Sequence, residues 1–421
     1  MQVNQTVLAN GLRILTVERP QTETVSLGIW VNTGAACENI DNNGISHFVE
    51  HMVFKGTQKR NALQISEDIE NAGGQTNAYT SREMTVFYAK MLKEDIELAT
   101  DVLADLVMAP TFDAAEMAKE KEVVVQEIKQ SYDDPSDIVH DYFHETAFAD
   151  QALGRSILGP AEKVRGFTAD DLRQYMQHNY AAENMVAVAV GNLNHEAFVK
   201  MVEERMAALR SKTNFVKDKQ VYTGGVCAKQ RDIEQAQVLI GFPAVDYHSP
   251  DYYTVSILST ILGGSMSSRL FQEIREKRGL VYTVYSFANA HTQTGLFGIY
   301  AGLDAEQIKN YVPVVADELK KIATDLVTDT ELNRVRTQFK ASMLMALESS
   351  SSTAEVVARQ QLIHNRIIPV EEIVERIEGV TKEKIRTMAQ TIFSGKPTYT
   401  LLGNLKDYPD YAALQQMIKM G

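Results

Sequence analysis

Residues 44–57 have the sequence GISHFVEHMVFKGT, which contains the motif His-x-x-Glu-His at positions 47–51. On a helix, His47 and His51 lie one turn apart on one face, so both imidazoles can reach one metal ion. Glu50 leans to the same side and is placed beside the metal rather than on it. Ser46 is expected at the start of this helix, and Gly56 is expected just after its end.

The two histidines also have a simpler interpretation, as ordinary residues of the hydrophobic core. A single histidine on a buried helix is more often an ordinary core residue than a metal ligand. This pair is different, because the chain has only nine histidines in 421 residues and a glutamate accompanies them. The order His-x-x-Glu-His is the signature of one class of zinc peptidases. The motif therefore predicts a zinc site that its structural context must confirm.

Length, charge and cysteine usage restrict the class of protein. A chain of 421 residues exceeds one ordinary hydrophobic core, so two or more domains are expected. The net charge of −13 disfavours nucleic acid and anionic membranes as partners. We find no apolar run of about 18 residues, and no signal or transit peptide at the N-terminus. Cys37 and Cys227 fit a reducing compartment, so a cytoplasmic location is expected.

The first half of the chain alternates strands with helices. Asn10-Gly11 is a strong hairpin signal between two short apolar runs. Hairpins mixed with helices predict an α+β fold, in which helices pack on a mostly antiparallel sheet. Strands are expected at 6–8, 12–17, 25–31, 75–80 and 84–89, and helices at 62–72, 92–108 and 113–131.

The second half repeats the first at a nearly constant offset. Residues 166–172, 191–193 and 27–29 are echoed at 379–385, 403–405 and 240–242, which are offsets of 213, 212 and 213. This periodicity predicts two similar domains related by internal duplication. The expected bounds are 1–212 for the first domain, 213–220 for a linker and 221–421 for the second domain. At the same offset, His47 and His51 fall on Thr260 and Gly264, so the second domain has no metal motif.

A third metal ligand is expected from another element, because a catalytic zinc normally has three protein ligands and one water. Glu120 and Glu127 are seven residues apart on one predicted helix and therefore share a face. Val124 and Ile128 lie beside them, so this face is at least partly buried and its carboxylates need a partner or an ion. An ordinary solvated Glu/Lys face is the alternative, and the pattern alone leaves both open.

The chain resembles the M16 (pitrilysin/insulinase) family of zinc metallopeptidases, and within it the M16B group of the mitochondrial processing peptidase beta subunit and bacterial processing proteases. The family motif is His-x-x-Glu-His with a distal glutamate about 75 residues on, and Glu127 follows His51 by 76. The resemblance extends over nearly the whole chain. It includes residues 10–12, 54–57, 73–74, 77–80, 269–271 and 275–282.

The resemblance implies a zinc endopeptidase with one Zn²⁺ per chain. His47, His51 and Glu127 would bind the metal, and Glu120 would orient a ligand or its neighbours without binding the metal itself. A zinc-bound water would be the nucleophile, and Glu50 would act as its general base.

The resemblance also implies a set of substrate-binding residues. Asn77, Ala78 and Tyr79 match an edge strand that binds peptide by adding it to the sheet. Arg275 and Tyr282 match residues that hold a peptide carbonyl and the tetrahedral oxyanion. Without the resemblance, the first group is an ordinary edge strand, and the basic segment around Arg275 is an ordinary helix end before a glycine cap.

Two further acidic residues suggest a substrate preference. Asp137 and Asp141 are four apart, so on a helix they share a face that could receive one guanidinium. Acidic residues at about these places in the mitochondrial processing peptidase receive an arginine near the cleavage point. The implied substrates are basic peptides or unfolded presequence-like segments. A solvated acidic helix start is the alternative interpretation.

Assembly follows from the number of domains. Family enzymes enclose peptides in a chamber of four such domains, so this two-domain chain is expected to dimerise. A homodimer would suffice, and a paired M16 subunit is the alternative partner. Two rival functions remain: a non-catalytic or assembly subunit of an M16 heterodimer, and a zinc hydrolase acting on a non-peptide substrate.

Overall fold

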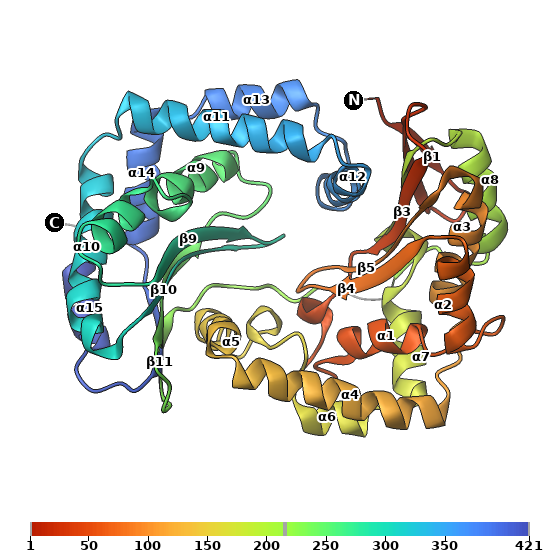
Figure 1. The fold of residues 1–421 in the computed structure, drawn as a ribbon, viewed down its shortest axis with the longest axis horizontal. Helices are drawn as coiled ribbons and strands as arrows, with labels where there is room; N and C mark the ends of the chain where they lie inside the picture. The colour runs from red at the N-terminus through yellow and green to blue at the C-terminus, as the bar shows by residue number, and fades with distance from the viewer. Residues whose placement is uncertain (1, 214–216, 420–421) are drawn as a thin grey trace. The chain divides into compact units, whose positions relative to one another are not determined.

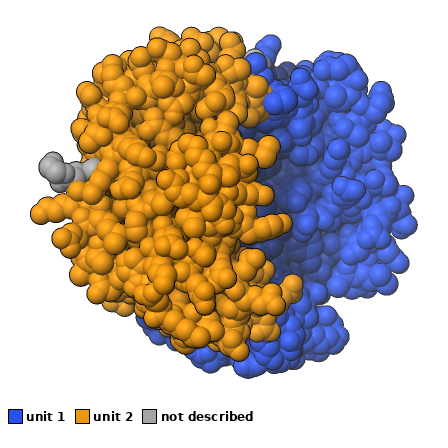
Figure 2. Space-filling view, turned by 60° about the vertical axis from the view of Figure 1, so that its left-hand side comes forward, with its two compact units in different colours: residues 1–129, 155–218, 343–369 blue, residues 130–154, 219–342, 370–421 orange. Residues whose placement is uncertain are grey.

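The computed structural model describes residues 2–213 and 217–419, which divide into two compact units (Figure 2). Unit 1 comprises residues 1–129, 155–218 and 343–369, and unit 2 comprises residues 130–154, 219–342 and 370–421. The predicted linker, 213–220, contains the end of unit 1 and the start of unit 2, and its residues 214–216 lie outside the described part of the chain.

The centre of unit 1 is a six-stranded sheet with the order β1-β2-β6-β3-β5-β4 (Figure 1). All neighbouring strands are antiparallel except β2 and β6, which are parallel. The predicted hairpin joins β1 to β2, where Gly11 has a positive φ of 95°. The strands are β1 Asn4–Val7, β2 Arg13–Glu18, β3 Thr24–Val31, β4 Gln75–Thr80, β5 Thr85–Leu92 and β6 Met185–Gly191.

Helices cover both faces of this sheet. One face packs on α1 and its neighbours through a core that includes Phe48, Phe87 and Leu103. The other face packs on α12 through a second cluster that includes Trp30 and Val357. The helices of unit 1 are α1 Ile45–Val53, α2 Ala62–Asn71, α3 Ile96–Met108, α6 Ala161–Gly166, α7 Ala169–Asn179, α8 His195–Met206 and α12 Ser350–His364, with most of α4 Ala114–Asp133.

Unit 2 repeats this plan with a five-stranded sheet of order β7-β11-β8-β10-β9. Among its described strands, the parallel pair is β7 and β11, which corresponds to β2 and β6 of unit 1. Alternate residues of β8, such as Ile240 and Phe242, point into the core beneath the helices, whereas Gly241 faces Phe143 of α5. The strands are β7 Gly225–Gln230, β8 Ala236–Ala244, β9 Thr283–Ala290, β10 Gly295–Leu303 and β11 Thr398–Gly403. The helices are α5 Pro135–Ala147, α9 Tyr252–Gly263, α10 Ile308–Thr324, α13 Val370–Glu378, α14 Lys382–Phe393 and α15 Tyr411–Ile418, with most of α11 Asp329–Ala346.

The internal duplication is confirmed by equivalent residues in equivalent places. Thr168 and Thr381, 213 positions apart, are the N-caps of α7 and α14. Gly191 and Gly403 end the equivalent strands β6 and β11 with φ of 145° and 154°. A β-carbon at these glycines would lie 2.2 Å from the Thr24 carbonyl oxygen and 2.8 Å from the Ala236 Cα. Both the conformation and the close approach therefore require glycine.

Two equivalent helices are exchanged between the halves of the chain. α5 comes from the first half of the sequence and packs on β8 and β11 of unit 2. α12 comes from the second half and packs on β3 and β6 of unit 1. The compact units therefore differ from the predicted ranges 1–212 and 221–421 at these two segments. None of the described helices combines the length and hydrophobicity that crossing a membrane requires.

Candidate metal centre

The helix α1 carries the His-x-x-Glu-His motif and begins differently from the prediction. It starts at Ile45, with Gly44 as its N-cap and no capping side chain from Ser46. The Glu38 carboxylate takes that role, because it accepts the backbone N–H groups of Gly44 and Ser46, each at 2.8 Å. Ser46 instead shares a hydrogen bond of 2.5 Å with the Tyr175 hydroxyl. Serine was the expected signal, but a buried acid from the preceding segment satisfies the first turn.

The other side of the centre comes from α4. Its buried residues include Met117, Glu120, Val124 and Val125, so the face proposed from the sequence packs against the protein. Glu120 is 5% exposed, whereas the Glu127 side chain is 38% exposed. The alternative of a fully solvated Glu/Lys face does not apply to Glu120.

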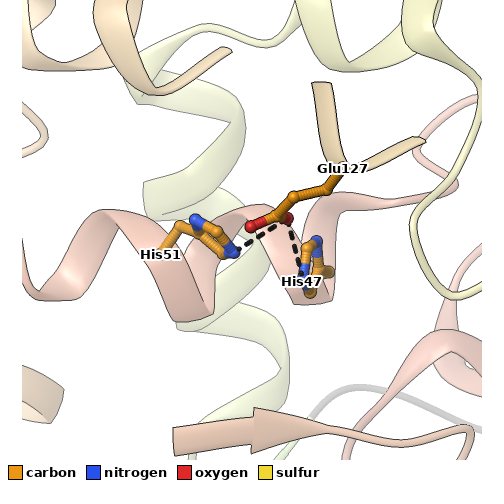
Figure 3. Close-up of side chains that lie close together, drawn as sticks. All are labelled: His47, His51 and Glu127. Atoms are coloured by element: carbon orange, nitrogen blue, oxygen red, sulfur yellow. Dashed lines mark ion pairs between the residues drawn. The ribbon is translucent and has the colours of Figure 1, made fainter. Parts of the chain in front are cut away.

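His47, His51 and Glu127 converge on one point (Figure 3). The Nε2 atoms of His47 and His51 lie 3.8 Å and 3.4 Å from the Glu127 Oε2. Ligands held about 2.0–2.1 Å from a tetrahedral zinc are roughly 3.4 Å from one another, so these separations suit such an ion. Two imidazole nitrogens and one carboxylate oxygen are also donors that zinc accepts. Among the described residues, this is the one group of three potential ligands whose atoms all lie within 4.8 Å of one another.

Glu120 fixes the orientation of His51. The His51 Nδ1 donates to the Glu120 Oε1 at 2.8 Å, which leaves Nε2 directed at Glu127. Lys55 forms an ion pair of 2.7 Å with the other oxygen of Glu120. Burial raises the pKa of Glu120, but the hydrogen bonds with His51 and Lys55 outweigh burial and hold it below its usual value. Such an outer carboxylate sets the tautomer of a metal-binding histidine.

His47 is held as a neutral ring. Burial, together with the nearby His51, lowers the pKa of His47 to about 3. Its Nδ1 is buried and has no hydrogen-bond partner within the described residues. A neutral imidazole whose Nε2 faces a carboxylate and a second imidazole is the form that binds a metal.

Glu50 lies on α1 and its carboxylate contacts Thr80 at the end of the edge strand β4. Burial raises the pKa of Glu50, against hydrogen bonds from Thr80 that lower it. Its Oε2 is buried and finds no hydrogen-bond partner in the part of the chain that the structure describes. A carboxylate with a raised pKa and an oxygen that forms no hydrogen bond is suited to accept a proton.

The predicted edge strand is confirmed as an edge. Among the described strands, β4 pairs with β5 alone, so its other side faces no strand; the Ala78 N–H donates to the Asn77 Oδ1 at 2.8 Å. The Tyr79 hydroxyl donates to Glu355 of α12 at 2.7 Å, and the Trp30 indole donates to the other oxygen of that carboxylate at 2.7 Å. Glu355 is a support that the sequence did not indicate, because it lies 276 residues from Tyr79.

The remaining predicted site residues lie in unit 2. Arg275 and Tyr282 are in contact, with the guanidinium 5.7 Å from the ring centre, and the tyrosine is 71% exposed. Gly279 has a φ of 60° and its N–H donates to the Arg275 carbonyl, so the glycine cap of the alternative interpretation is present. Asp137 and Asp141 are one turn apart on α5, and Asp137 accepts a hydrogen bond from the Ser131 hydroxyl.

Comparison with known proteins identifies the family. Residues 13–161 match the profile described as "Insulinase (Peptidase family M16)", and residues 166–339 match "Peptidase M16 inactive domain". The three candidate metal ligands, His47, His51 and Glu127, all lie in the first range.

Sequence relatives are named as proteases. An "Uncharacterized zinc protease" of Streptomyces coelicolor is 35% identical over 96% of this chain and 90% of its own length. Another from Bacillus subtilis is 36% identical over 91% of this chain and 94% of its length. The "Probable mitochondrial-processing peptidase subunit beta" of Arabidopsis thaliana is 32% identical over 96% of this chain and 79% of its length.

A solved structure supports the fold. A protease from Helicobacter pylori has a TM-score of 0.88 and 21% identity, covering 95% of this chain and 99% of the other. At that identity the similarity concerns the fold alone.

Proposed function

Because this chain belongs to peptidase family M16 and its relatives are named zinc proteases, we propose that it is a zinc endopeptidase that cleaves peptides or unfolded presequence-like segments inside a chamber. The observation that carries the proposal is the convergence of His47, His51 and Glu127 beside Glu50. The proposed metal ligands are those three residues, with one zinc per chain.

The chemistry is divided between the metal and the side chains. Bound zinc supplies Lewis acidity toward the scissile carbonyl and makes a water more acidic. Glu50 takes a proton from the attacking water and returns it to the leaving amine. Glu120 keeps His51 in the orientation and tautomer that a ligand needs.

Substrate binding is proposed for three groups of residues. The open edge of β4, with Asn77, Ala78 and Tyr79, binds an extended peptide through backbone hydrogen bonds. Arg275 and Tyr282 bind a carbonyl and the oxyanion of the transition state. Asp137 and Asp141 favour arginine near the scissile bond.

A dimer is also proposed, either of two copies of this chain or of this chain with a second M16 subunit. The rival function, a non-catalytic or assembly subunit, is disfavoured because His47, Glu50, His51 and Glu127 are all present. A zinc hydrolase of non-peptide substrates is disfavoured by the open edge strand. The solution mass during turnover tests the assembly, and a monomeric mass would exclude the dimer.

The test of function uses a quenched basic peptide. The purified protein is expected to cleave it, to lose activity with a chelator and to regain activity when zinc is added. Glu50→Gln is expected to keep its zinc and lose nearly all turnover, because glutamine cannot accept the proton. Near-normal turnover in Glu50→Gln would exclude Glu50 as the base.

A further inference from the structure

The segment directly after α1 contains a lysine whose partner belongs to the metal centre. We propose that Lys55 is a positioning residue for zinc, which acts by holding Glu120 in the place where Glu120 orients His51. The proposal rests on the proposed metal ligands and adds a residue to which the sequence pattern assigned no role. Lys55 does not reach the ligand atoms itself, so it is not a catalytic residue.

The contacts form a chain from Lys55 to the ligand. The Lys55 Nζ lies 2.7 Å from the Glu120 Oε2, and the Glu120 Oε1 lies 2.8 Å from the His51 Nδ1. Each oxygen of the carboxylate therefore has a separate partner. The Glu120 side chain is 6% exposed, so the loss of one partner leaves an oxygen that water reaches poorly. Glu120 can then rotate toward solvent and away from His51.

Lys55 is placed by a segment that is itself fixed. The next residue, Gly56, has a φ of 137°, and its carbonyl accepts both the backbone N–H and the hydroxyl of Thr111, each at 3.0 Å. Thr111 precedes α4, the helix that carries Glu120 and Glu127. The segment after α1 is thus tied to the start of the other ligand-bearing helix.

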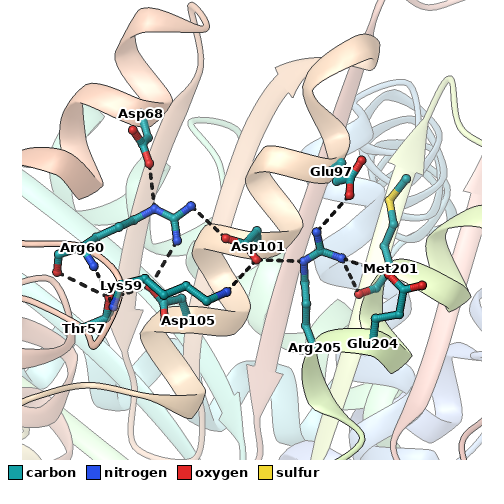
Figure 4. A network of polar contacts seen from close by, with 10 residues as sticks. All are labelled: Thr57, Lys59, Arg60, Asp68, Glu97, Asp101, Asp105, Met201, Glu204 and Arg205. Atoms are coloured by element: carbon teal, nitrogen blue, oxygen red, sulfur yellow. Dashed lines mark hydrogen bonds and ion pairs between the residues drawn. The ribbon is translucent and has the colours of Figure 1, made fainter.

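A network of ion pairs holds the same segment against α3 (Figure 4). The Thr57 hydroxyl donates to Asp105 at 2.5 Å, and Arg60 donates to Asp105 and to Asp101 at 3.2 Å and 2.8 Å. Lys59 pairs with Asp101 at 2.9 Å. The backbone around Lys55 is therefore anchored without help from its ammonium group. Replacing the Lys55 side chain should disturb Glu120 while leaving this segment in place.

The direction in which zinc affinity changes when Lys55 is replaced distinguishes a positioning role from a purely electrostatic one. An ammonium group near the site repels a dication, so if Lys55 acted only through its charge, its removal would tighten zinc binding. If Lys55 positions Glu120, its removal weakens zinc binding. Outer partners of metal ligands are typically worth 10–100-fold in metal affinity. Lys55 is one contact further from the metal than Glu120, so we expect a loss of about tenfold, at the lower end of that range.

The experiment measures zinc affinity by competition with a chromogenic chelator. Lys55→Met keeps the apolar stem and removes the charge, and Lys55→Arg keeps a donor for Glu120. Lys59→Met is the matched control, because Lys59 lies in the same segment and pairs with Asp101 instead of Glu120. We expect weaker zinc binding in Lys55→Met, recovery of most of the affinity in Lys55→Arg and wild-type affinity in Lys59→Met. The visible spectrum of the Co²⁺-loaded protein should change in Lys55→Met alone.

The outcomes distinguish the positioning role of Lys55 from the proposed set of metal ligands on which it rests. Zinc binding in Lys55→Met that is unchanged or tighter would overturn the positioning role. His51→Ala is measured beside it, and full zinc affinity in that variant would remove the ligand set itself. Loss of zinc in His51→Ala with wild-type affinity in Lys55→Met would overturn only the role of Lys55. Thermal unfolding of the metal-free variants checks the fold, and Lys55→Gln replaces Lys55→Met if the latter does not fold.

Discussion

The cap of α1 by Glu38 offers a quantitative test, because it supports the helix that carries both histidines. Glu38 is 4% exposed, and its carboxylate accepts the backbone N–H groups of Gly44 and Ser46 and the side-chain amide of Asn43. In Glu38→Ala these three donors lose their acceptor. The α1 terminus would then have no capping group, since Gly44 offers no side chain.

The expected cost follows from counting the donors. A net loss of about 1 kcal/mol for each unsatisfied donor gives a decrease of about 3 kcal/mol in the free energy of unfolding. Part of this is offset, because burial raises the pKa of Glu38 and its removal relieves the cost of burying a carboxyl. Water that enters the space left by the side chain would reduce the loss further. We therefore expect about 2–3 kcal/mol, which is a large effect for one side chain.

The assay is denaturant unfolding of the metal-free protein, followed through the transition of the unit that contains α1. The matched control is Glu23→Ala, since the Glu23 side chain is 75% exposed and forms an ion pair of 2.7 Å with the Lys93 ammonium. That exposed pair should contribute less than about 1 kcal/mol. A Glu38→Ala midpoint equal to that of Glu23→Ala would refute the capping argument.

Four further outcomes are expected. His47→Ala and Glu127→Gln should lower the zinc content of the purified protein, and full metal occupancy in either variant would remove that residue from the ligand set. Arg275→Ala and Tyr282→Phe should keep their zinc and lower kcat/KM, by about 3 kcal/mol in transition-state stabilisation if one oxyanion donor is lost; wild-type kinetics in both would leave unit 2 without a direct role. Asp137→Asn/Asp141→Asn should reduce the preference for arginine over alanine peptides at moderate salt, and an unchanged ratio would show that these residues do not bind the arginine. Burial raises the pKa of Glu38, so the folded protein holds a proton that the unfolded chain releases. The contribution of this carboxyl to stability is therefore present below pH 4.5 and is lost as the pH rises through the folded pKa. Glu38→Gln should lack this dependence when the two profiles of unfolding free energy against pH are compared.

The grouping of the three candidate metal ligands could be predicted because its signal is local or nearly so. His47 and His51 lie on one short helix, and Glu127 lies on a helix whose buried face was visible in the spacing of Glu120, Val124 and Glu127. The duplication was equally visible, because Gly191 and Gly403 occupy a backbone conformation that only glycine adopts readily. These features depend on residue type at a fixed spacing.

Contacts between distant segments could not be predicted in the same way. Ser46 was the expected start of α1, yet the cap comes from Glu38, which no capping pattern links to this helix. Lys55 was visible as part of the segment 54–57, but its role depends on Glu120, 65 residues further along the chain. Glu355 supports Tyr79 from the other half of the sequence. Each case joins residues whose separation gives no periodic signal.

The exchange of α5 and α12 could not be predicted for the same reason, because it too depends on contacts between distant segments. The pattern of apolar residues indicates that one face of a helix is buried, but it does not identify the sheet that buries it. The buried residues of α12 include Ala354 and Ala358, small side chains that allow close packing on any flat apolar surface. Phe143 of α5 fits where Gly241 leaves room, because a β-carbon there would lie 2.3 Å from its ring. Since Gly28 is the equivalent of Gly241 and lies beneath the Trp30 ring instead, the two sheets differ at the site where each exchanged helix packs. The side-chain shapes at these two positions of the sheets therefore differ, and they become apparent only when the strands are assembled.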